Sequence, residues 1–298
     1  MPRVSIVIPA YNPGHYLDLA IQSVVAQTFT DWELIVVDDG SAEDLSYIGE
    51  KYSAVKMIRQ SNQGASVARN AGILASSGRL IAFLDSDDLW EPTKLEHQIT
   101  LMNANPNAGL CHTSFQIINA QGAVTGPGFQ GYDKDYNELL MGCGICASTV
   151  IVRRECLAAS GLFDPFCPPV EDYDLWLKLS RYYSICRVES NQAFYRIHSQ
   201  NISGNYAKML RKQTEILNHH ILLAKSQNDR GTLQAAYKGK QRARALYGVQ
   251  AFDSARRSLR EHKLKSFAKH LFFALKHSPK YAITSLVSHK AKSKHPAI

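Results

Sequence analysis

Short apolar runs that alternate with amphipathic segments constrain the fold of this chain more than any other feature. Each run has five or six residues and is rich in Val, Ile and Leu, which is typical of a buried strand. The segments between them repeat apolar residues at helical spacing, for example from Leu17 to Val25. This alternation predicts an α/β fold with a mostly parallel sheet and helices on both faces. The runs are Val4–Pro9, Trp32–Val37, Val55–Arg59 and Leu80–Leu84.

The rest of this region predicts further elements. Pro92 suits the first residue of a helix, which we expect to run to about Met102. Gly122–Gly131 is rich in glycine, which predicts a loop. The other expected helices are Tyr16–Gln27, Ala42–Tyr52, Ser66–Ala75 and Asp174–Tyr182, and the other expected strands are Leu110–Ile118 and Ser148–Val152.

Polar clusters directly follow three of the four apolar runs. Tyr11-Asn12 follows the first, Asp38-Asp39 the second and Asp85-Ser86-Asp87-Asp88 the fourth. Because ligands of open parallel sheets bind beyond the carboxyl ends of the strands, these clusters predict one shared binding edge.

Asp85, Asp87 and Asp88 are three carboxylates within four residues, and they repel one another unless a cation neutralises them. Mg²⁺ and Mn²⁺ suit such oxygen ligands and complete their coordination with water and substrate phosphates. The alternative is an acidic turn that caps the following helix. The position after a strand favours the metal site.

Three other groups permit two interpretations each. Asp39 can accept hydrogen bonds from a ligand or cap the next helix. Glu171-Asp172 can supply a general base, although the local pattern alone favours the acidic first turn of a helix. His198, in Tyr195-Arg196-Ile197-His198, can bind a metal or transfer protons, or can be one of the chain's ordinary surface histidines.

Several enzyme classes lack their motifs here. The first run is followed by Tyr11-Asn12-Pro13-Gly14 rather than G-x-G-x-x-G, which argues against a nicotinamide-dependent dehydrogenase. There is no G-x-x-x-x-G-K-[ST] phosphate loop and no G-x-S-x-G nucleophile elbow.

Seven motifs follow one another along the chain. They are Val4–Asn12, Val36–Ser41, Gly64–Gly72, Phe83–Asp88, Gly161–Asp164, Glu171–Leu177 and Tyr195–His198. Taken in order, they resemble those of family 2 glycosyltransferases of the GT-A fold. The resemblance covers about Val4 to Ser203 and implies a Rossmann-like sheet flanked by helices. It therefore predicts a glycosyltransferase domain over residues 1–204 and a basic helical extension over 205–298.

The resemblance also implies a role for each matching residue. Asp172 would be the catalytic base with Glu171 as its neighbour, Asp87 and His198 would hold the metal, and Asp88 would support them. Tyr11 would lie against the nucleobase and Asp39 would accept a hydrogen bond from it. The donor-binding residues would be Pro9, Ala10, Tyr11, Asp39, Arg69, Asp85 and Ser86.

The implied reaction is metal-dependent transfer with inversion, using Mn²⁺ or Mg²⁺. The donor would be a nucleotide sugar, a UDP-linked hexose or N-acetylhexosamine, and the acceptor a hydroxyl group in the synthesis of cell-surface polysaccharide or glycolipid. Loops such as Gly122–Asp135 and Cys143–Thr149 would set specificity. The alternatives are a sugar nucleotidyltransferase, which would need a basic Gly-rich loop after the first run, and a non-catalytic nucleotide-sugar-binding protein.

The charge of the chain is unevenly distributed. Residues 206–298 carry 20 Lys and Arg against 4 Asp and Glu, a net +16, which leaves −8 for the remainder of a chain of net charge +8. By charge alone a basic extension fits nucleic acid, an anionic membrane surface or an anionic glycan, or a solvated helical element for packing or homo-oligomer formation. We expect no nucleic-acid partner. The expected helices are Tyr206–Lys225, Thr232–Gln250 and Ala255–Lys276.

The sequence also predicts a compartment. Its six cysteines lack the spacing of a disulfide framework, which favours a reducing environment. The N-terminal apolar stretch is too short for a signal peptide, and no run of about 18 apolar residues occurs. We therefore expect a cytoplasmic protein, at the membrane if the basic helices bind it.

Overall fold

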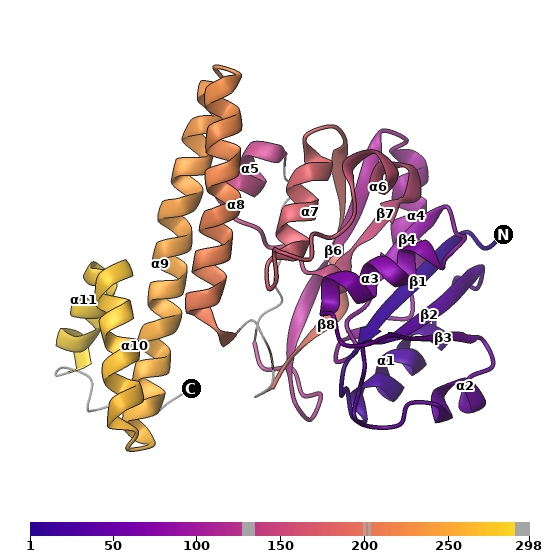
Figure 1. Cartoon of the computed structure of the whole chain (residues 1–298), viewed down its shortest axis with the longest axis horizontal. Helices are drawn as coiled ribbons and strands as arrows, with labels where there is room; N and C mark the ends of the chain where they lie inside the picture. Colours follow the sequence, from indigo (N-terminus) through magenta and orange to yellow (C-terminus); the bar gives the residue numbers. More distant parts are fainter. Residues whose placement is uncertain (127–134, 199–200, 202–203, 290–298) are drawn as a thin grey trace. The chain divides into compact units, whose positions relative to one another are not determined.

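The computed structural model describes residues 1–126, 135–198, 201 and 204–289. Its chain divides into two compact units (Figure 1). The first comprises Met1–Leu139 and Cys143–Asn201, and the second comprises Leu140–Gly142 and Ile202–Ile298. The predicted loop Gly122–Asp135 lies largely outside the described residues.

A mixed sheet forms the centre of the first unit. Its described strands have the order β3-β2-β1-β4-β7-β6-β8-β5. The first four in sequence pair in parallel, as predicted, whereas β7 runs antiparallel to both β4 and β6. The strands are β1 (Val4–Ala10), β2 (Trp32–Asp38), β3 (Val55–Arg59), β4 (Leu80–Phe83), β5 (Leu89–Trp90), β6 (Ala108–Asn119), β7 (Ile151–Arg153) and β8 (Ser184–Ile197).

Helices cover the sheet because alternate strand side chains face opposite sides. Ile6 and Ile8 of β1 belong to a core that includes the buried side of α1 and of α4. Val37 of β2 packs instead with Ala68 of α3. The short helices here are α1 (Tyr16–Val25), α2 (Tyr47–Lys51), α3 (Ala65–Leu74), α4 (Lys94–Ala104), α5 (Tyr136–Met141), η1 (Ala147–Thr149), α6 (Arg154–Ser160) and α7 (Glu171–Ser180).

Helix α3 approaches β1 closely at Gly72. A Cβ atom added there would lie 2.3 Å from Cγ1 of Val7 and 3.3 Å from Cγ2 of Val37. Real Cβ contacts are never that short, so only glycine lets α3 pack this tightly on the sheet. The close approach sets the position of Arg69, one helical turn earlier.

Several element boundaries differ from the sequence predictions. The helix predicted from Ala42 begins only at Tyr47, because Asp44 Oδ1 accepts a hydrogen bond from Ser46 N at 2.9 Å and stabilises a turn instead. Helix α4 begins after Thr93, so Pro92 lies outside it. The predicted strand Ser148–Val152 divides into η1 and β7, and α7 begins at Glu171 rather than Asp174.

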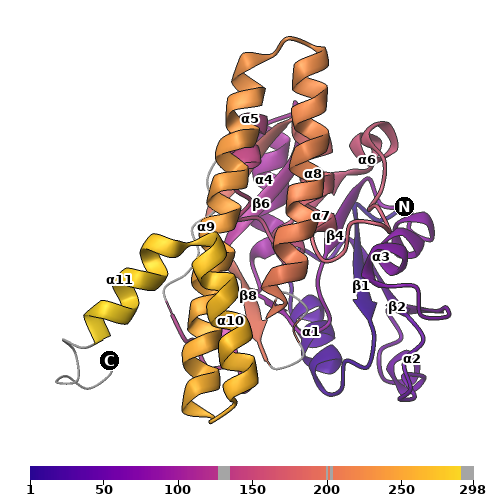
Figure 2. The ribbon, with the colours of Figure 1, turned by 60° about the vertical axis from the view of Figure 1, so that its left-hand side comes forward.

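The second unit is helical, with α8 (Tyr206–Ser226), α9 (Arg230–Arg260), α10 (Leu264–His277) and α11 (Pro279–His289). In Figure 2, α9 lies alongside α8 over one part of its length and alongside α10 over another. Tyr247, Phe252 and Ala274 are buried in the core that these helices share. The side chains of Asn205 and Asp229 cap the first turns of α8 and α9.

The predicted break between Gln250 and Ala255 is wrong, because α9 continues to Arg260. Buried Ala251, Phe252 and Ala255 extend its apolar face through that region. The helix ends where His262 takes a left-handed conformation, with φ of 56°. Within the described residues, the helices include none that combines the length and apolar character of a membrane-spanning segment.

Candidate active site

The turns that follow β1 and β2 brace each other. Asn12 N donates to Ser41 Oγ at 2.9 Å, and Ala42 N donates to Asn12 Oδ1 at 2.8 Å. Tyr11 is consequently held at the strand end with 55% of its surface exposed. Pro9 and Ala10 are buried within β1, so any contact that they make with a ligand is through the main chain.

Asp39 anchors the segment after β3. Its Oδ1 accepts from Gln60 Nε2 at 2.7 Å and from Gln63 N at 2.9 Å, and its Oδ2 accepts from Gly64 N at 2.7 Å. Asp39 is 3% exposed. The carboxylate that is predicted to accept a hydrogen bond from a nucleobase thus also accepts hydrogen bonds from the segment that leads into α3.

Arg69 of α3 joins two parts of the site that are distant in sequence. Its Nη2 donates to Asp85 Oδ1 at 2.6 Å and its Nη1 donates to Glu171 Oε1 at 2.8 Å. Its side chain is only 6% exposed. Burial lowers the pKa of Arg69, but the two carboxylates more than offset this and hold it above its ordinary value. Arg69, which the family resemblance assigns to donor binding, thus links Asp85 to the start of α7.

Asp172 follows Glu171 in the first turn of α7. Burial, and then the neighbouring Glu171 carboxylate, raise the pKa of Asp172 to about 7, against the opposing effect of Arg69. A carboxyl group with such a pKa changes protonation state near neutral pH, as a general base requires. Among the residues that the structure describes, Glu171 Oε2 and Arg69 Nε are buried without a hydrogen-bond partner.

Asp88 is the buried residue of the acidic turn Asp85–Asp88 and fixes the turn to neighbouring elements. It is 1% exposed, and its two oxygens accept from Ser148 Oγ at 2.5 Å and from Arg196 N at 2.8 Å. Ser148 Oγ also accepts from Asp85 N at 3.1 Å. Burial and the carboxylates of Asp87 and Asp85 raise the pKa of Asp88 well above its ordinary value. Asp88 therefore ties the turn to η1 and β8.

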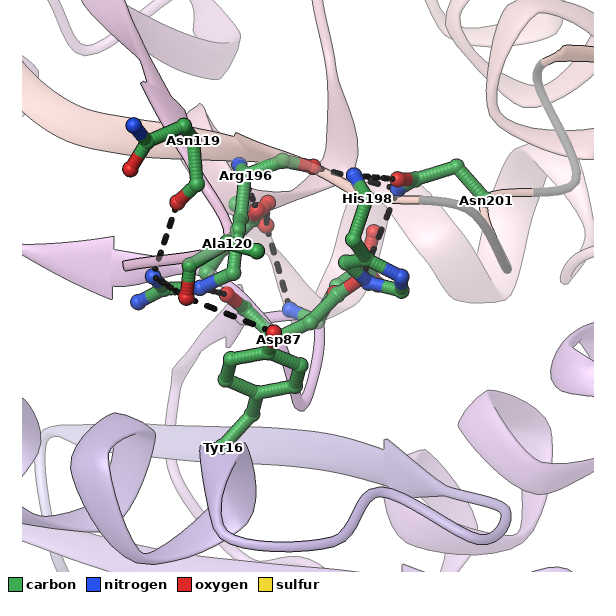
Figure 3. A network of polar contacts seen from close by, with 10 residues as sticks. Tyr16, Asp87, Asn119, Ala120, Arg196, His198 and Asn201 are labelled. Atoms are coloured by element: carbon green, nitrogen blue, oxygen red, sulfur yellow. Dashed lines mark hydrogen bonds and ion pairs between the residues drawn. The ribbon is translucent and has the colours of Figure 1, made fainter. Parts of the chain in front are cut away.

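Asp87 meets His198, 111 residues later in the chain (Figure 3). Asp87 Oδ2 lies 2.8 Å from His198 Nε2, and the two side chains are 24% and 13% exposed. The ring of His198 stacks on Tyr16, with centroids 5.3 Å apart. Asn201 Nδ2 lies 3.5 Å from Asp87 Oδ2. The structure thus brings together the two residues that we predicted to hold a metal.

Arg196, which was not among the predicted site residues, holds this pair in place. Its Nε donates to the main-chain oxygen of Asp87 at 2.7 Å, and its guanidinium lies 4.7 Å from the centre of the Tyr16 ring (Figure 3). Nη1 donates to the carbonyl of Asn119 at 3.2 Å. The sequence signal for Arg196 is its position two residues before His198, because residues two apart along an extended chain face the same side of the sheet.

The residues around Asp87 fit a divalent cation. Oδ2 of Asp87 and Nε2 of His198 are 2.8 Å apart, and adjacent ligands of an octahedral ion stand about 3 Å apart. Burial and the Asp85 carboxylate raise the pKa of Asp87, so a cation would relieve an unfavourable charge there. Asp85 and the half-buried Ser86 lie in the same turn. A carboxylate–imidazole pair open to a ligand's phosphates is a suitable donor set for Mn²⁺.

Comparison with known proteins identifies the relatives of this chain. The family described as glycosyl transferase family 2 matches residues 5–154. Escherichia coli WfgD, a UDP-Glc:alpha-D-GlcNAc-diphosphoundecaprenol beta-1,3-glucosyltransferase, is 36% identical over 228 residues, which are 73% of this chain and 86% of WfgD. The E. coli enzyme WfaP has the same described activity and is 33% identical over 221 residues, which are 73% of this chain and 86% of WfaP.

Solved structures confirm the fold. S. aureus TarS 1-349 in complex with UDP-GlcNAc has a TM-score of 0.60 at 16% identity, over 92% of this chain and 91% of that one. The mannosyltransferase PcManGT from Pyrobaculum calidifontis, in complex with GDP-Man and Mn²⁺, has a TM-score of 0.64 at 14% identity, over 99% and 81% of the two chains. The predicted GT-A architecture is therefore confirmed.

Proposed function

Because the chain belongs to glycosyl transferase family 2, we propose that it transfers a sugar from a UDP-linked donor to a hydroxyl group of a lipid-linked saccharide, with inversion at the anomeric carbon. That the chain is a glycosyltransferase follows from its family. The donor, the acceptor, the metal and the roles of the residues are what we propose. Family membership also argues against the sugar nucleotidyltransferase that the sequence left open.

The meeting of three segments at Arg69 carries the proposal. Through Arg69, the acidic turn and the first turn of α7 lie within one hydrogen-bonded cluster. The cluster therefore connects the turn that contains Asp87, a carboxylate suited to a metal, to the helical turn that contains Asp172, a carboxyl group suited to proton transfer. A displacement at a diphosphate-linked sugar needs both of these groups on one substrate.

In the proposed reaction, Asp172 accepts the proton of the acceptor hydroxyl while the hydroxyl oxygen attacks the anomeric carbon. The nucleoside diphosphate leaves from the opposite face, which inverts the configuration. Mn²⁺ or Mg²⁺, held by Asp87 and His198, would neutralise the charge that develops on the leaving diphosphate. Glu171, whose Oε1 accepts from Arg69 Nη1 at 2.8 Å, would hold that arginine beside Asp172.

The names of the relatives support the choice of substrates. WfgD and WfaP are named for UDP-glucose and for an N-acetylglucosamine-diphosphoundecaprenol acceptor, and each is covered over 86% of its length. The exposed Tyr11 beside Asp39 supports a nucleobase site at the end of β1 and β2. We therefore propose a role in the synthesis of cell-surface glycolipid or polysaccharide.

Release of UDP and formation of a glycosylated acceptor provide the test. A panel of UDP-sugars is incubated with Mn²⁺ and a synthetic lipid-diphosphate-linked N-acetylglucosamine, and the product linkage is read by NMR. A β-linked product from an α-linked donor supports inversion. Retention, or absence of turnover with every UDP-sugar, would contradict the proposal.

Asp87→Ala is expected to weaken Mn²⁺-dependent binding of UDP roughly a hundredfold, since it removes one of the two proposed metal ligands. Isothermal titration with UDP in the presence and absence of Mn²⁺ measures the effect. Asp253→Ala, which removes an exposed carboxylate from α9, is the control and should change nothing. Equal metal-dependent affinity in the Asp87 variant and the control would refute the assignment.

The pH dependence of kcat/KM should show an acid limb near neutral pH. Asp172 accepts a proton only when ionised, and its pKa is raised to about 7 by burial and by Glu171, against Arg69 and with a smaller contribution from Asp85. Activity should therefore increase as the pH rises through about 7. A profile measured at saturating Mn²⁺ that stays flat down to the ordinary carboxyl range would argue against Asp172 as the base.

A further inference from the structure

Helix α10 exposes a continuous apolar stripe. Leu264, Ala268, Phe272 and Leu275 follow one another at intervals of four, four and three residues, which places them on one side of the helix. Leu264 is 68% exposed and Phe272 70% exposed. Large apolar side chains so exposed in a row mark an interaction surface rather than ordinary surface composition.

A row of lysines borders this stripe. Lys265, Lys269 and Lys276 are exposed and lie next to the apolar residues around the helix. No acidic residue occurs in α10, and none occurs in the sequence after Glu261, where eight lysines are found. The exposed face of α10 is therefore half apolar and half cationic. We call this face, formed by these three lysines with Leu264, Ala268, Phe272 and Leu275, the α10 face.

The opposite side of α10 fixes the helix to its own unit. Ala274 is fully buried against the core that includes Tyr247 and Phe252 of α9. Tyr206 of α8 contacts the rings of His270 and Phe273. Because α10 is anchored by this side, the α10 face cannot turn inward to bury its apolar residues.

We propose that the α10 face docks the protein on an anionic lipid surface. Apolar side chains beside a lysine row are the arrangement that inserts into the headgroup boundary while cations meet lipid phosphates. A second copy of the chain is disfavoured as the occupant. A symmetric contact through this face would set the lysines of the two copies against each other, with no acidic residue of α10 to neutralise them.

This docking is separate from the reaction chemistry, because the α10 face contains no residue of the proposed active site. It would raise the local concentration of the enzyme at a membrane that carries lipid-linked acceptors. Binding of vesicles therefore tests it without reference to turnover, and failure of the proposed reaction would leave the result unaffected.

The experiment is co-sedimentation of the full chain with phosphatidylcholine vesicles that contain or lack phosphatidylglycerol. The full chain should sediment with the anionic vesicles only, and less so at high salt. The variant K265E/K269E/K276E should lower partitioning onto anionic vesicles by about a hundredfold, since each lysine near such a surface contributes about fivefold. L264S/F272S should lower it about tenfold or more.

Matched variants separate the α10 face from charge and hydrophobicity in general. K225E/K238E/R242E makes the same change in net charge on exposed positions of α8 and α9. L222S/L246S removes two leucines that are 66% and 53% exposed on those helices. Both controls should bind vesicles much as the unaltered chain does. Circular dichroism confirms that each variant keeps its helical content.

Three outcomes would overturn the proposal. The first is equal sedimentation with neutral and anionic vesicles, or none with either. The second is equal loss of binding in the α10 variants and their controls. The third is a change from dimer to monomer in L264S/F272S, measured by analytical ultracentrifugation, with vesicle binding unchanged, which would assign the face to a second copy of the chain.

Discussion

Replacing Asp172 by asparagine is expected to lower kcat by about 10²- to 10⁴-fold, which is the usual contribution of a general base. Asparagine keeps the size of the side chain but cannot accept the proton of an acceptor hydroxyl. UDP and Mn²⁺ should still bind within about twofold of the unaltered affinity, because the proposed metal ligands lie on the acidic turn and directly after β8 rather than on α7. Single-turnover measurement of transfer, with titration of UDP, checks both parts.

The same variant carries a second expectation, for stability. The pKa of Asp172 in the folded protein, about 7, exceeds its ordinary value of 3.8. Its stabilising contribution is therefore present at low pH and is lost as the pH rises through about 7. Above that pH the buried charge opposes folding, so Asp172→Asn should unfold at a temperature no lower than the unaltered chain. Loss of activity without loss of stability would distinguish a catalytic group from a structural one.

Asp174→Asn is the control within the same helical turn. Asp174 pairs with Lys178 at 2.5 Å in an (i, i+4) arrangement, which contributes to α7 rather than to proton transfer. Its substitution should leave kcat within about twofold and cost only a few tenths of a kcal/mol. Equal losses of kcat in Asp172→Asn and Asp174→Asn would mean that disturbance of α7, and not removal of a base, explains the effect.

The three strand-end motifs were predictable because their signals are local. A strand of five to seven residues and the turn after it can be recognised from a short window of sequence, and parallel strands then place their ends at one edge. Tyr11, Asp39 and the acidic turn all follow this logic. The boundaries of α2 and α9 were not predictable in the same way. The start of α2 depends on the hydrogen bond from Ser46 N to Asp44 Oδ1, and the length of α9 depends on the packing of Phe252.

The pairing of Asp87 with His198 could not be derived from spacing, since 111 residues separate them. Only the resemblance to a family suggested that both would face one metal. The resemblance did not predict that Arg69 would be buried between Asp85 and Glu171, or that Arg196 would donate a hydrogen bond to the main chain of Asp87. These contacts depend on which elements pack together, which a single motif does not encode.

The acidic turn also illustrates how identical residue types acquire different properties. Asp85 pairs with Arg69, Asp87 meets His198, and Asp88 is buried on Ser148 and a main-chain N–H. The sequence presents three equivalent carboxylates, whereas their partners come from α3, β8 and η1. Asp85 and Asp88 thus have partners of their own, and Asp87 is the carboxylate that we propose binds a cation, which would relieve the repulsion among the three charges.

Replacing Arg69 by methionine is expected to destabilise the chain by about 3 to 5 kcal/mol, because it leaves two largely buried carboxylates without their cation. Asp85 and Glu171 are 28% and 10% exposed at the side chain, and Arg69 is their shared partner. Thermal unfolding measures the loss, which corresponds to a decrease in Tm of roughly 6 to 20 °C for a domain of this size. Arg154→Met is the control, since Arg154 donates to main-chain carbonyls of Gly78 and Ile73.

The decisive result is in the pH profile rather than in the stability. Arg69 lowers the pKa of Asp172, so its removal should raise that pKa further and move the acid limb of kcat/KM above pH 7. Arg154→Met should leave the limb in place whatever its effect on stability, because Arg154 donates to Gly78, Ile73 and Ser76 and to no active-site carboxylate. Adding Glu171→Gln to Arg69→Met removes one unpaired charge and should restore part of the stability and return the limb toward lower pH. If Arg69→Met lowers stability but leaves the acid limb in place, Arg69 only holds α3 against α7. If Arg69→Met changes both the limb and the stability, and the added Glu171→Gln partly restores both, Arg69 sets the protonation of Asp172.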